Sequence, residues 1–572
     1  MQNSWLGGRQ TIWSRLQKTA KISMSEPTAH IDTYIRDNLP PKEFWPEMDY
    51  SVLPELAAYP GQMNCAVELL DKQTKKYGDR PVIHFEDATW TYNDLLAKAN
   101  QIAHVLVDDL GIMPGNRVFM RAPNNPMYVA IWLAVMKVGA IGVATMPLLR
   151  AKELTYITEK AVVKVGFCCD HLKDEMEKTI AQSTTFENAI YFSNLGQKPG
   201  NGNLDELMAG KPTTFDNIDT AADDVCLIAF TSGTTGPAKG CMHFHRDILA
   251  ICDTFSRYVL KPTPEDIFCG SPPVAFTFGL GALVTFAMHA GSSTALCEGP
   301  APEALMGIIE KHKATICFTA PTAFRVMTDL VDKYDISSLT KSVSAGETLP
   351  LPTYEGWKKA TGIKTIDGIG STEMLHIFIA AAEDDIVPGA TGVPIPGFQG
   401  MVIDDDGNEV ADGEVGRLAV KGPTGCRYLD NAERQAAYVQ NGWNVTGDTY
   451  MKDAEGNFWF QARNDDMIIS AGYNISGPEV EACLLEHPKV AECGVVAAPD
   501  PERGHIVKAY VMLREPSEAG PALAKTLQDY VKAQIAPYKY PRAIEFMTDM
   551  PRTETGKLQR FRLREMAAAA SR

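Results

Sequence analysis

Short apolar runs alternate with stretches of helical periodicity over about residues 71–212. The runs at 105–107, 117–120 and 140–145 are typical of buried strands, and the apolar spacing over 128–138 is that of a helix. Strands that alternate with helices usually form parallel sheets with helices on their faces. This part of the chain therefore predicts a doubly wound βα lobe.

The same alternation resumes after an apolar run at 225–230, which predicts a buried strand. Helices are expected near 247–258 and 302–311, and strands near 267–270 and 315–318. We therefore expect a second doubly wound lobe that shares one crevice with the first, since ligands of such folds lie at the ends of the strands.

Past Gly389 the pattern changes to short strands separated by turns, with hairpin signals at 404–408 and at Asn441-Gly442. The predicted fold class is α/β. A large N-terminal domain, residues 25–464, contains the two doubly wound lobes and a small β-rich subdomain at about 389–464. A small α+β domain follows at 465–572, with helices near 478–487 and 522–534 and strands near 492–498 and 508–513.

Composition narrows the class of partner. The chain of 572 residues has 71 acidic and 54 basic residues, a formal charge of −17. No global positive field is available to attract nucleic acid or anionic lipid, so neither is an expected partner. The apolar stretch at 130–149 is interrupted by Lys137 and two glycines, which favours a buried helix and strand over a membrane span.

Cysteine usage and the N-terminus bear on location. The 12 cysteines are scattered without the spacing of a zinc or redox motif, which indicates reduced thiols and a cytoplasmic protein. Residues 1–24 are basic and contain no acid, as in an organellar transit peptide. The favoured interpretation is a dispensable or disordered extension before a true start at Met24.

The most informative motif follows the apolar run at 225–230. Glycines allow the backbone to approach an anion, and hydroxyl and ammonium groups can donate to a polyphosphate. The spacing is not that of a Walker loop, and the alternative is a flexible surface turn. The residues proposed to hold phosphate are Thr231, Ser232, Gly233, Thr234, Thr235 and Lys239.

Three further segments have chemistry of their own. A glycine-rich turn at 367–373 ends in Glu373, a carboxylate suited to Mg²⁺, although a helix N-cap is an equal alternative for this string alone. Asp448 is expected on a tight turn, where it could bind ribose hydroxyls together with Arg463. Lys557 lies near the C-terminus, where a lone lysine is usually a solvated surface residue.

In this order the segments resemble the acyl-adenylate-forming superfamily, which includes acyl-CoA synthetases, firefly luciferase and peptide-synthetase adenylation domains. The resemblance extends from about residue 33 to 564. It implies that Lys557, Thr372 and Glu373 are catalytic and that Glu373 binds Mg²⁺. The implied ATP-binding residues are Thr231, Ser232, Gly233, Thr234, Thr235, Lys239, Gly346, Glu347, Asp367, Gly368, Ile369, Thr372, Asp448, Arg463 and Lys557.

The string at 367–378 and the segment at 275–281 are similar to the benzoate-CoA ligase branch, and the N-terminal segment at 36–41 is similar to 2-aminobenzoate-CoA ligases. Two phenylalanines before a glycine turn suit a planar ring, or they are ordinary core residues. The implied acyl-pocket residues are Phe276, Phe278, Ala320, Gly346, Ile369 and His376.

The resemblance also implies that the C-terminal domain is mobile, with a hinge at Asp465, and that Gly472 and Tyr473 line a tunnel for CoA. Two positions depart from the common pattern. Ile469 stands where many relatives have lysine, and Gln461-Ala462-Arg463 replaces a frequent Gly-Arg. The first departure removes a positive contact, and the second alters hinge packing while keeping the arginine.

The predicted activity is ATP-dependent ligation of a benzoate-type acid to CoA through an acyl-adenylate, with AMP and diphosphate as products. ATP, Mg²⁺ and CoA are the implied cofactor and cosubstrates. Alternatives are a ligase for 2-aminobenzoate or another ring-substituted, alicyclic or fatty acid, an enzyme that loads a carrier protein, and a non-catalytic adenylate sensor. A homodimer is one candidate assembly. His243 and His245 have alternate spacing without an accompanying Cys or Asp cluster, so they are interpreted as structural.

Overall fold

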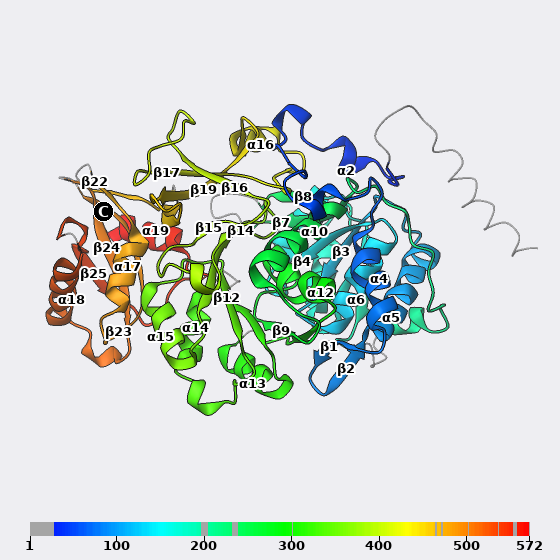
Figure 1. Ribbon diagram of the computed structural model, residues 1–572, viewed down its shortest axis with the longest axis horizontal. Coiled ribbons are helices and arrows are strands. Elements are labelled where there is room, and N and C mark those ends of the chain that lie inside the picture. Colours follow the sequence, from blue (N-terminus) through cyan, green and yellow to red (C-terminus); the bar gives the residue numbers. More distant parts are fainter. Residues whose placement is uncertain are drawn as a thin grey trace, which may run out of the picture.

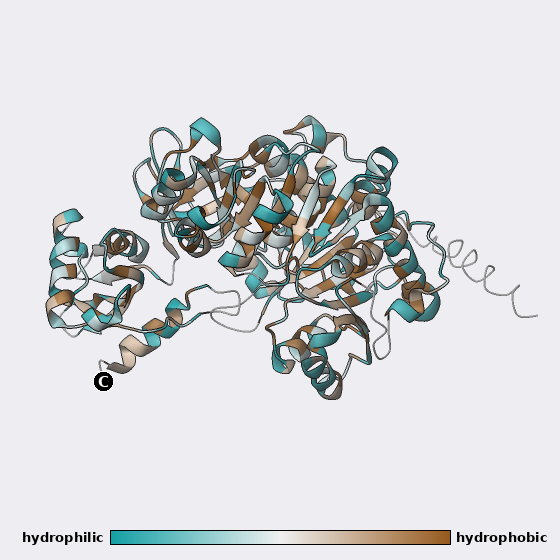
Figure 2. Cartoon of the chain, turned by 90° about the horizontal axis from the view of Figure 1, so that it is seen from below, coloured by the Kyte–Doolittle hydropathy of each residue, from teal (hydrophilic) through white to brown (hydrophobic). Residues whose placement is uncertain are grey.

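The computed structural model describes residues 28–195, 204–231, 238–299, 301–463, 466–470, 473–500, 503–535, 537–552 and 557–570. The chain has an α/β fold with a large N-terminal part and a smaller C-terminal domain, coloured orange to red in Figure 1. The predicted fold class is confirmed. In Figure 2, brown (hydrophobic) strands lie inside the large part, and teal (hydrophilic) segments are frequent on its outer helices.

One sheet of the large part has six strands in the order β6-β5-β3-β4-β7-β8. Its strands are parallel except β8, which pairs antiparallel with β7 at the edge. The strands are β3 (Arg117–Arg121), β4 (Ile141–Thr145), β5 (Val165–Cys169), β6 (Asn188–Phe192), β7 (Val225–Phe230) and β8 (Gly240–Phe244). Helices in this part of the chain include α5 (Tyr92–His104), α6 (Pro126–Lys137), α7 (Ala151–Lys160) and α8 (Lys173–Gln182).

All residues of α6 are buried. The stretch at 130–149 is thus a core helix followed by β4, as its interruptions predict. Among the residues that the structure describes, every helix is too short or too polar to cross a bilayer.

The second sheet has nine strands in the order β15-β14-β13-β12-β11-β9-β10-β1-β2, of which the six from β13 to β1 are parallel. They are β1 (Pro81–Phe85), β2 (Ala88–Thr91), β9 (Ile267–Gly270), β10 (Ser293–Leu296), β11 (Ile316–Thr319), β12 (Lys341–Ala345), β13 (Thr365–Gly370), β14 (Ile377–Ala380) and β15 (Val393–Pro394). Associated helices include α10 (His245–Ile251), α11 (Thr277–Leu280), α13 (Pro302–His312), α14 (Pro321–Thr328) and α15 (Leu351–Thr361).

The β-rich part is a five-stranded antiparallel sheet, yellow in Figure 1. A two-residue hairpin at Asn441-Gly442 joins two of its strands, and both residues have positive φ, 49° and 76°. Those angles are what a type I′ turn requires, which is why Asn-Gly predicts it. The strands are β16 (Gln399–Ile403), β17 (Val415–Lys421), β18 (Val439–Gln440), β19 (Trp443–Lys452) and β20 (Phe458–Arg463), with α16 (Ala432–Tyr438) before β18.

The C-terminal domain packs helices against a three-stranded sheet and has its own apolar core. It approaches the large part where Arg325 of α14 lies 4.0 Å from Glu492. Its elements are β21 (Ile468–Ser470), β22 (Tyr473–Ile475), α17 (Gly477–Leu485), β23 (Val490–Asp500), β24 (Gly504–Leu513), α18 (Pro521–Gln534), β25 (Ala543–Phe546) and α19 (Arg560–Ala570).

Three local predictions are wrong. Residues 105–107 are not a strand but lie in the π-helical continuation of α5, Val105–Asp109, because a three-residue apolar run has no period of its own. Asp448 lies inside β19 rather than on a turn, since the turn is made by Asn441-Gly442. The glycine-rich string at 367–370 belongs to β13, and the turn begins only at Ser371.

Candidate active site

The candidate site lies where several parallel strands end, as expected for an open α/β sheet. Thr231 follows β7, Ala320 follows β11, Gly346 follows β12 and Gly370 ends β13. The neighbouring order β11, β12 and β13 brings the last three positions to one edge of the nine-stranded sheet. Residues far apart in the sequence therefore face one region.

The predicted phosphate loop closes the hairpin between β7 and β8. Phe230 pairs with Gly240, and the Thr231 N–H donates to the Lys239 carbonyl over 2.9 Å. The Lys239 Nζ lies 5.8 Å from the centre of the Tyr428 ring, and burial lowers the pKa of this lysine. Ser232, Gly233, Thr234 and Thr235 lie outside the described residues.

Glu373 lies in the turn at 371–376, between β13 and β14. The Ser371 Oγ accepts from the Met374 N–H over 3.1 Å, and the Thr424 hydroxyl donates to the Met374 carbonyl over 2.8 Å. The Tyr428 hydroxyl donates to Glu373 Oε1 over 2.6 Å. Burial, followed by the Glu373 charge, raises the pKa of Tyr428, so this phenol stays a donor.

The oxygen chemistry of this turn suits a hard cation. Glu373 is largely buried, so its carboxylate charge requires compensation, and Mg²⁺ prefers one or two carboxylates together with phosphate oxygens. The Tyr428 hydroxyl leaves Oε2 as the atom available for such a ligand.

Lys557 approaches the end of β12 from the C-terminal domain. A Cβ placed on Gly346 would lie 3.4 Å from both Cε and Nζ of Lys557. Gly346 has a φ of +88°, a conformation that favours glycine, and it leaves room for the ammonium. Burial raises the pKa of the adjacent Glu347, against the opposing effects of the Thr322 hydroxyl and the Lys557 charge.

Asp448 and Arg463 are directly opposite in the antiparallel pair of β19 and β20. Cross-strand neighbours lie within reach of one ligand, so the pairing suits two residues expected to bind the same ribose.

Asp367 lines a cavity of about 10 Å³, roughly the volume of one water molecule. Its Oδ1 has no hydrogen-bond partner among the described residues, and burial raises the pKa of its carboxyl to about 8. Gly368 and Ile369 follow it along β13, facing β14 across the hairpin.

The predicted acyl pocket contains an aromatic cluster around His376. The ring centre of His376 lies 4.6 Å from that of Phe286, 5.4 Å from that of Phe255 and 5.5 Å from that of Phe278. A Cβ on Gly281 would lie 2.3 Å from the imidazole, so that glycine admits the ring. Burial lowers the pKa of His376 to about 3, against the opposing effect of a hydrogen bond with the Phe278 backbone.

Phe276, Phe278 and Ile369 are half-buried and border the main apolar core, and Ala320 is also half-buried. The structure joins Phe278 and His376 directly and gives no ring contact between Phe276 and His376. Phe278 also contacts Phe318 at 5.8 Å between ring centres.

Known protein families agree with this arrangement of a large domain and a small C-terminal domain. The model of the AMP-binding enzyme family matches residues 70–427, and the model of its C-terminal domain matches residues 479–557. The chain belongs to the AMP-binding enzyme family.

Relatives among the AMP-binding enzymes cover nearly the whole chain. Benzoate--CoA ligase of Thauera aromatica is 31% identical over 522 residues, which span 90% of this chain and 98% of that protein. The human mitochondrial acyl-coenzyme A synthetase ACSM5 is 33% identical and spans 83% of this chain and 84% of its own. The crystal structure of the anthranilate CoA ligase AuaEII with anthranoyl-AMP has a TM-score of 0.86 and 32% identity, covering 90% of this chain and 99% of that chain.

These relatives confirm the resemblance to the benzoate and aminobenzoate branch. This AMP-binding enzyme is an ATP-dependent acid–CoA ligase.

Besides the four residues of the phosphate loop, two further residues of the predicted site lie outside the described residues. They are the hinge residue Asp465 and the tunnel residue Gly472, while Tyr473 begins β22. Asp466, the residue after the predicted hinge, forms an ion pair with Arg564 of α19, so the chain is tied to the C-terminal domain from this point.

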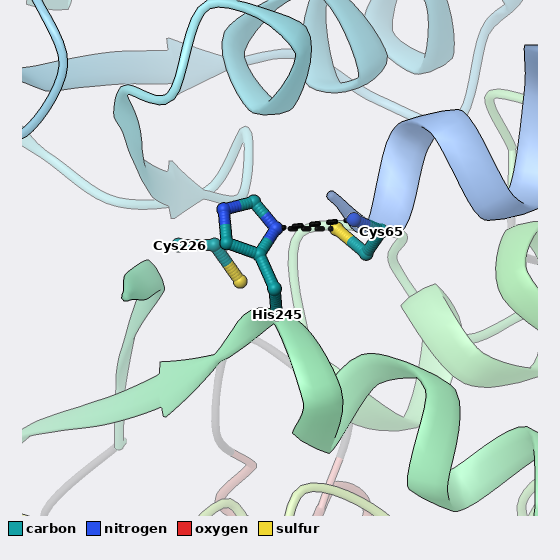
Figure 3. A group of neighbouring side chains, drawn as sticks. All are labelled: Cys65, Cys226 and His245. Atoms are coloured by element: carbon teal, nitrogen blue, oxygen red, sulfur yellow. Dashed lines mark hydrogen bonds between the residues drawn. The ribbon is translucent and has the colours of Figure 1, made fainter. Parts of the chain in front are cut away.

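Sequence reasoning missed Tyr428, which contacts Glu373 but belongs to no motif. It also assumed that no Cys or Asp accompanies the two histidines after the phosphate loop, and this is wrong. Cys65 and Cys226 lie beside His245, with possible ligand atoms within 4.8 Å of one another (Figure 3). These cysteines come from distant segments, so spacing along the chain gives no sign of them.

Cys65, Cys226 and His245 are fully buried, and they form a polar contact within the core. The Cys65 N–H donates to His245 Nδ1 over 3.2 Å, and the Cys65 Sγ lies 3.2 Å from the same nitrogen. The ring nitrogen beside the Cys65 thiol therefore already accepts a hydrogen bond from a backbone N–H.

Proposed function

We propose that the chain joins an aromatic acid of the benzoate type to CoA, with ATP converted to AMP and diphosphate. The observation that supports an acyl-adenylate route is the approach of Lys557 to Gly346. An ammonium there lies at the end of β12, beside the strand β13 that leads into the turn with Glu373 and His376.

In the first step a carboxylate oxygen of the acid attacks the α-phosphorus of ATP, and diphosphate leaves. Thr231, Lys239 and the loop between them would hold the phosphates. Thr372 would donate a further hydrogen bond, and Glu373 would bind Mg²⁺, which supplies charge neutralisation when bound. Lys557 would stabilise the oxygen charge that develops between the acid and the phosphate.

The nucleoside would lie against β13 and the pair of β19 and β20. Asp448 and Arg463 are proposed for the ribose hydroxyls, because they are cross-strand neighbours. The unpartnered Asp367 Oδ1 can accept from an exocyclic amine, while Gly346, Glu347, Gly368 and Ile369 would flank the base.

The aromatic preference is proposed from the cluster of Phe255, Phe278 and Phe286 around a neutral imidazole. Aromatic rings attract one another in edge-to-face and offset arrangements, so a benzoate ring would gain more here than a flexible alkyl chain. Phe276, Ala320, Ile369 and Gly346 would complete the pocket.

In the second step the CoA thiolate attacks the acyl carbon, AMP leaves with its electron pair, and a thioester forms. Lys557 cannot remain against the carboxylate while the thiol enters from the same side. We propose that the C-terminal domain turns about Asp465 and brings Gly472 and Tyr473 to the thiol. Ile469, in β21 of the same domain, would leave this tunnel without one positive contact.

A ligase for 2-aminobenzoate is the second candidate, supported by the 32% identity to the anthranilate ligase and by the uncharged imidazole of His376, which could accept a hydrogen bond from an ortho amine. A ring-substituted, alicyclic or fatty acid and loading of a carrier protein are the remaining alternatives. We further propose a cytoplasmic location, because all 12 cysteines are free thiols, and a homodimer as the assembly to be tested.

The test is AMP release that depends on both CoA and ATP, measured across benzoate, aminobenzoates, hydroxybenzoates, cyclohexanecarboxylate and medium-chain fatty acids. The highest kcat/KM should belong to an aromatic acid. A preference for the fatty acids would refute the aromatic assignment. Transfer of the acyl group to a carrier protein but not to CoA would refute CoA as the acceptor.

A further inference from the structure

His243, near the end of β8, connects the strand that follows the phosphate loop to the turn that contains Glu373. Its side chain is fully buried, and Nε2 lies 2.8 Å from the backbone carbonyl oxygen of Thr372, 129 positions away. A carbonyl oxygen can only accept, so Nε2 is protonated and donates. The Thr372 carbonyl also accepts from the Leu375 N–H over 3.3 Å.

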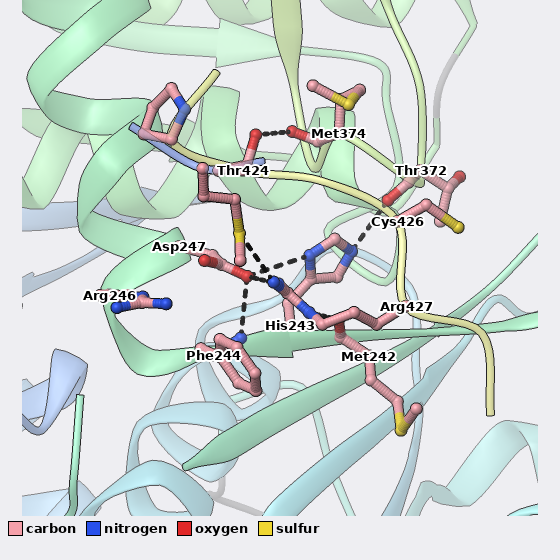
Figure 4. A network of polar contacts seen from close by, with 12 residues as sticks. Met242, His243, Phe244, Arg246, Asp247, Thr372, Met374, Thr424, Cys426 and Arg427 are labelled. Carbon is pink, nitrogen blue, oxygen red and sulfur yellow. Dashed lines mark hydrogen bonds and ion pairs between the residues drawn. The ribbon is translucent and has the colours of Figure 1, made fainter. Parts of the chain in front are cut away.

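The opposite nitrogen of the ring faces a buried ion pair (Figure 4). His243 Nδ1 lies 3.6 Å from Asp247 Oδ2, and that carboxylate also accepts from the Phe244 N–H over 3.0 Å. Arg427 forms an ion pair with Asp247, and none of these three side chains is exposed to solvent. Burial alone would raise the pKa of Asp247, but the charge of Arg427 opposes this effect and the pKa is lowered overall. The carboxylate therefore stays ionised.

Arg427 is itself held tightly. Its guanidinium carbon lies 3.9 Å from the centre of the Phe244 ring, and its Nε donates to the Met242 carbonyl over 3.3 Å. Its own carbonyl accepts from the Met242 N–H over 2.8 Å. The next residue, Tyr428, donates to Glu373. One rigid unit therefore holds the turn at two successive residues, Thr372 through His243 and Glu373 through Tyr428.

We propose that His243 is a positioning residue for Mg·ATP, an inference that rests on the proposed adenylation. It fixes the Thr372 peptide, and with it the Glu373 carboxylate, relative to Lys239, directly before β8. A side chain without a donor at this point would leave the partly buried Thr372 carbonyl with one partner fewer and free the turn to shift. Small displacements of a binding group reduce catalysis strongly, because reactions require close alignment.

His245 provides a matched comparison. It is equally buried, and it is separated from His243 by one residue. Its imidazole contacts Cys65 instead of Thr372. A loss of stability from replacing a core histidine should therefore appear in variants of both residues. A change in the KM for Mg·ATP should appear only in variants of His243.

The experiment compares His243→Gln, His243→Asn and His245→Asn. The glutamine amide can reach the place of Nε2, whereas the asparagine amide reaches only that of Nδ1. Acid-dependent ATP–diphosphate exchange gives kcat and the KM for Mg·ATP and for the acid, and calorimetry gives the binding of Mg·ATP without acid. Thermal melting measures stability separately.

We expect His243→Asn to lower kcat/KM for Mg·ATP about tenfold, as for loss of one partly buried hydrogen bond, with an unchanged KM for the acid. His243→Gln should recover most of that loss, and His245→Asn should retain the wild-type KM for Mg·ATP. Equal losses in the two His243 variants, or an equal rise of both KM values in His243→Asn and His245→Asn, would overturn the proposal. If the proposed function itself is wrong, the wild type would bind Mg·ATP but show no acid-dependent exchange, and this result is distinct from the two above.

Discussion

Replacing Lys557 with alanine tests how the acid and ATP are joined. In the structure a Cβ on Gly346 would lie 3.4 Å from the Lys557 Nζ, so the ammonium is already at the end of β12. Lys557→Ala removes that charge without touching the sheet. The first half-reaction should therefore slow, while the second half-reaction, from added acyl-adenylate, should proceed at the wild-type rate.

The magnitude follows from the surroundings of the side chain. Loss of one preorganised donor to a developing oxyanion typically reduces kcat by about 10²–10³, or about 2.7–4 kcal/mol. Lys557 is exposed in the structure, so water screens part of its charge before substrates bind. We therefore expect a reduction near the lower limit, about 100-fold.

The assay measures acid-dependent ATP–diphosphate exchange and, separately, thioester formation from synthetic benzoyl-adenylate and CoA. The control is Lys525→Ala on α18, which removes a lysine paired with Asp529 and 62% exposed. Surface pairs of this kind contribute about 0–1 kcal/mol, so neither half-reaction should change. Wild-type exchange by Lys557→Ala, or an equal loss in both half-reactions, would contradict a role of Lys557 in the first half-reaction alone.

Three further changes give separate tests. Gly346→Ala should slow adenylation and cost about 1 kcal/mol or more of stability, because a side chain at φ +88° is strained and crowds Lys557; unchanged exchange kinetics would contradict this. Asp465→Pro should spare adenylation and stop thioester formation, because proline fixes φ at the proposed hinge, and equal loss of both half-reactions would argue against a hinge there. Burial raises the pKa of Asp367 from 3.8 to about 8, so its contribution to stability is complete below pH 3.8 and is lost as pH rises through 8. Urea unfolding should therefore show the wild type losing about 4 kcal/mol relative to Asp367→Asn between pH 5 and about 8.5, and parallel curves would contradict the assignment.

Much of the fold can be predicted from local pattern. The run at Val225–Phe230 has the length and composition of a buried strand and becomes β7 with the same bounds. Asn441-Gly442 has the positive φ values that its turn requires. In both cases the decisive physics acts between residues close in sequence, so periodicity and turn chemistry are sufficient.

The wrong predictions concern residues whose conformation depends on neighbouring elements. Val105 begins a π-helical turn, because the preceding helix continues and a short apolar run does not determine its own conformation. Asp448 lies in a strand since it pairs with Arg463 across the sheet, and only the sheet register makes these two residues neighbours. A glycine beside a polar residue indicates a turn only where no strand pairs with it.

The candidate site also contains residues that the sequence predicts and residues that only the tertiary structure reveals. The motif residues Gly346 and Lys557 follow from the resemblance, and the structure adds that they lie together. Tyr428 and His243 have no motif and act through contacts with Glu373 and Thr372 that arise from tertiary packing. Such supporting contacts depend on side-chain geometry between distant segments, which the spacing of one sequence does not contain.

In the proposed reaction a carboxylate oxygen of the acid becomes bonded to the α-phosphorus of ATP. The most direct measurement uses benzoate labelled with ¹⁸O in its carboxylate, with ATP and CoA, and mass spectrometry of the AMP that is released. We expect AMP with one ¹⁸O atom, because the bridging oxygen leaves with the phosphate when the thiolate attacks. Unlabelled AMP, or label found in inorganic phosphate, would contradict it.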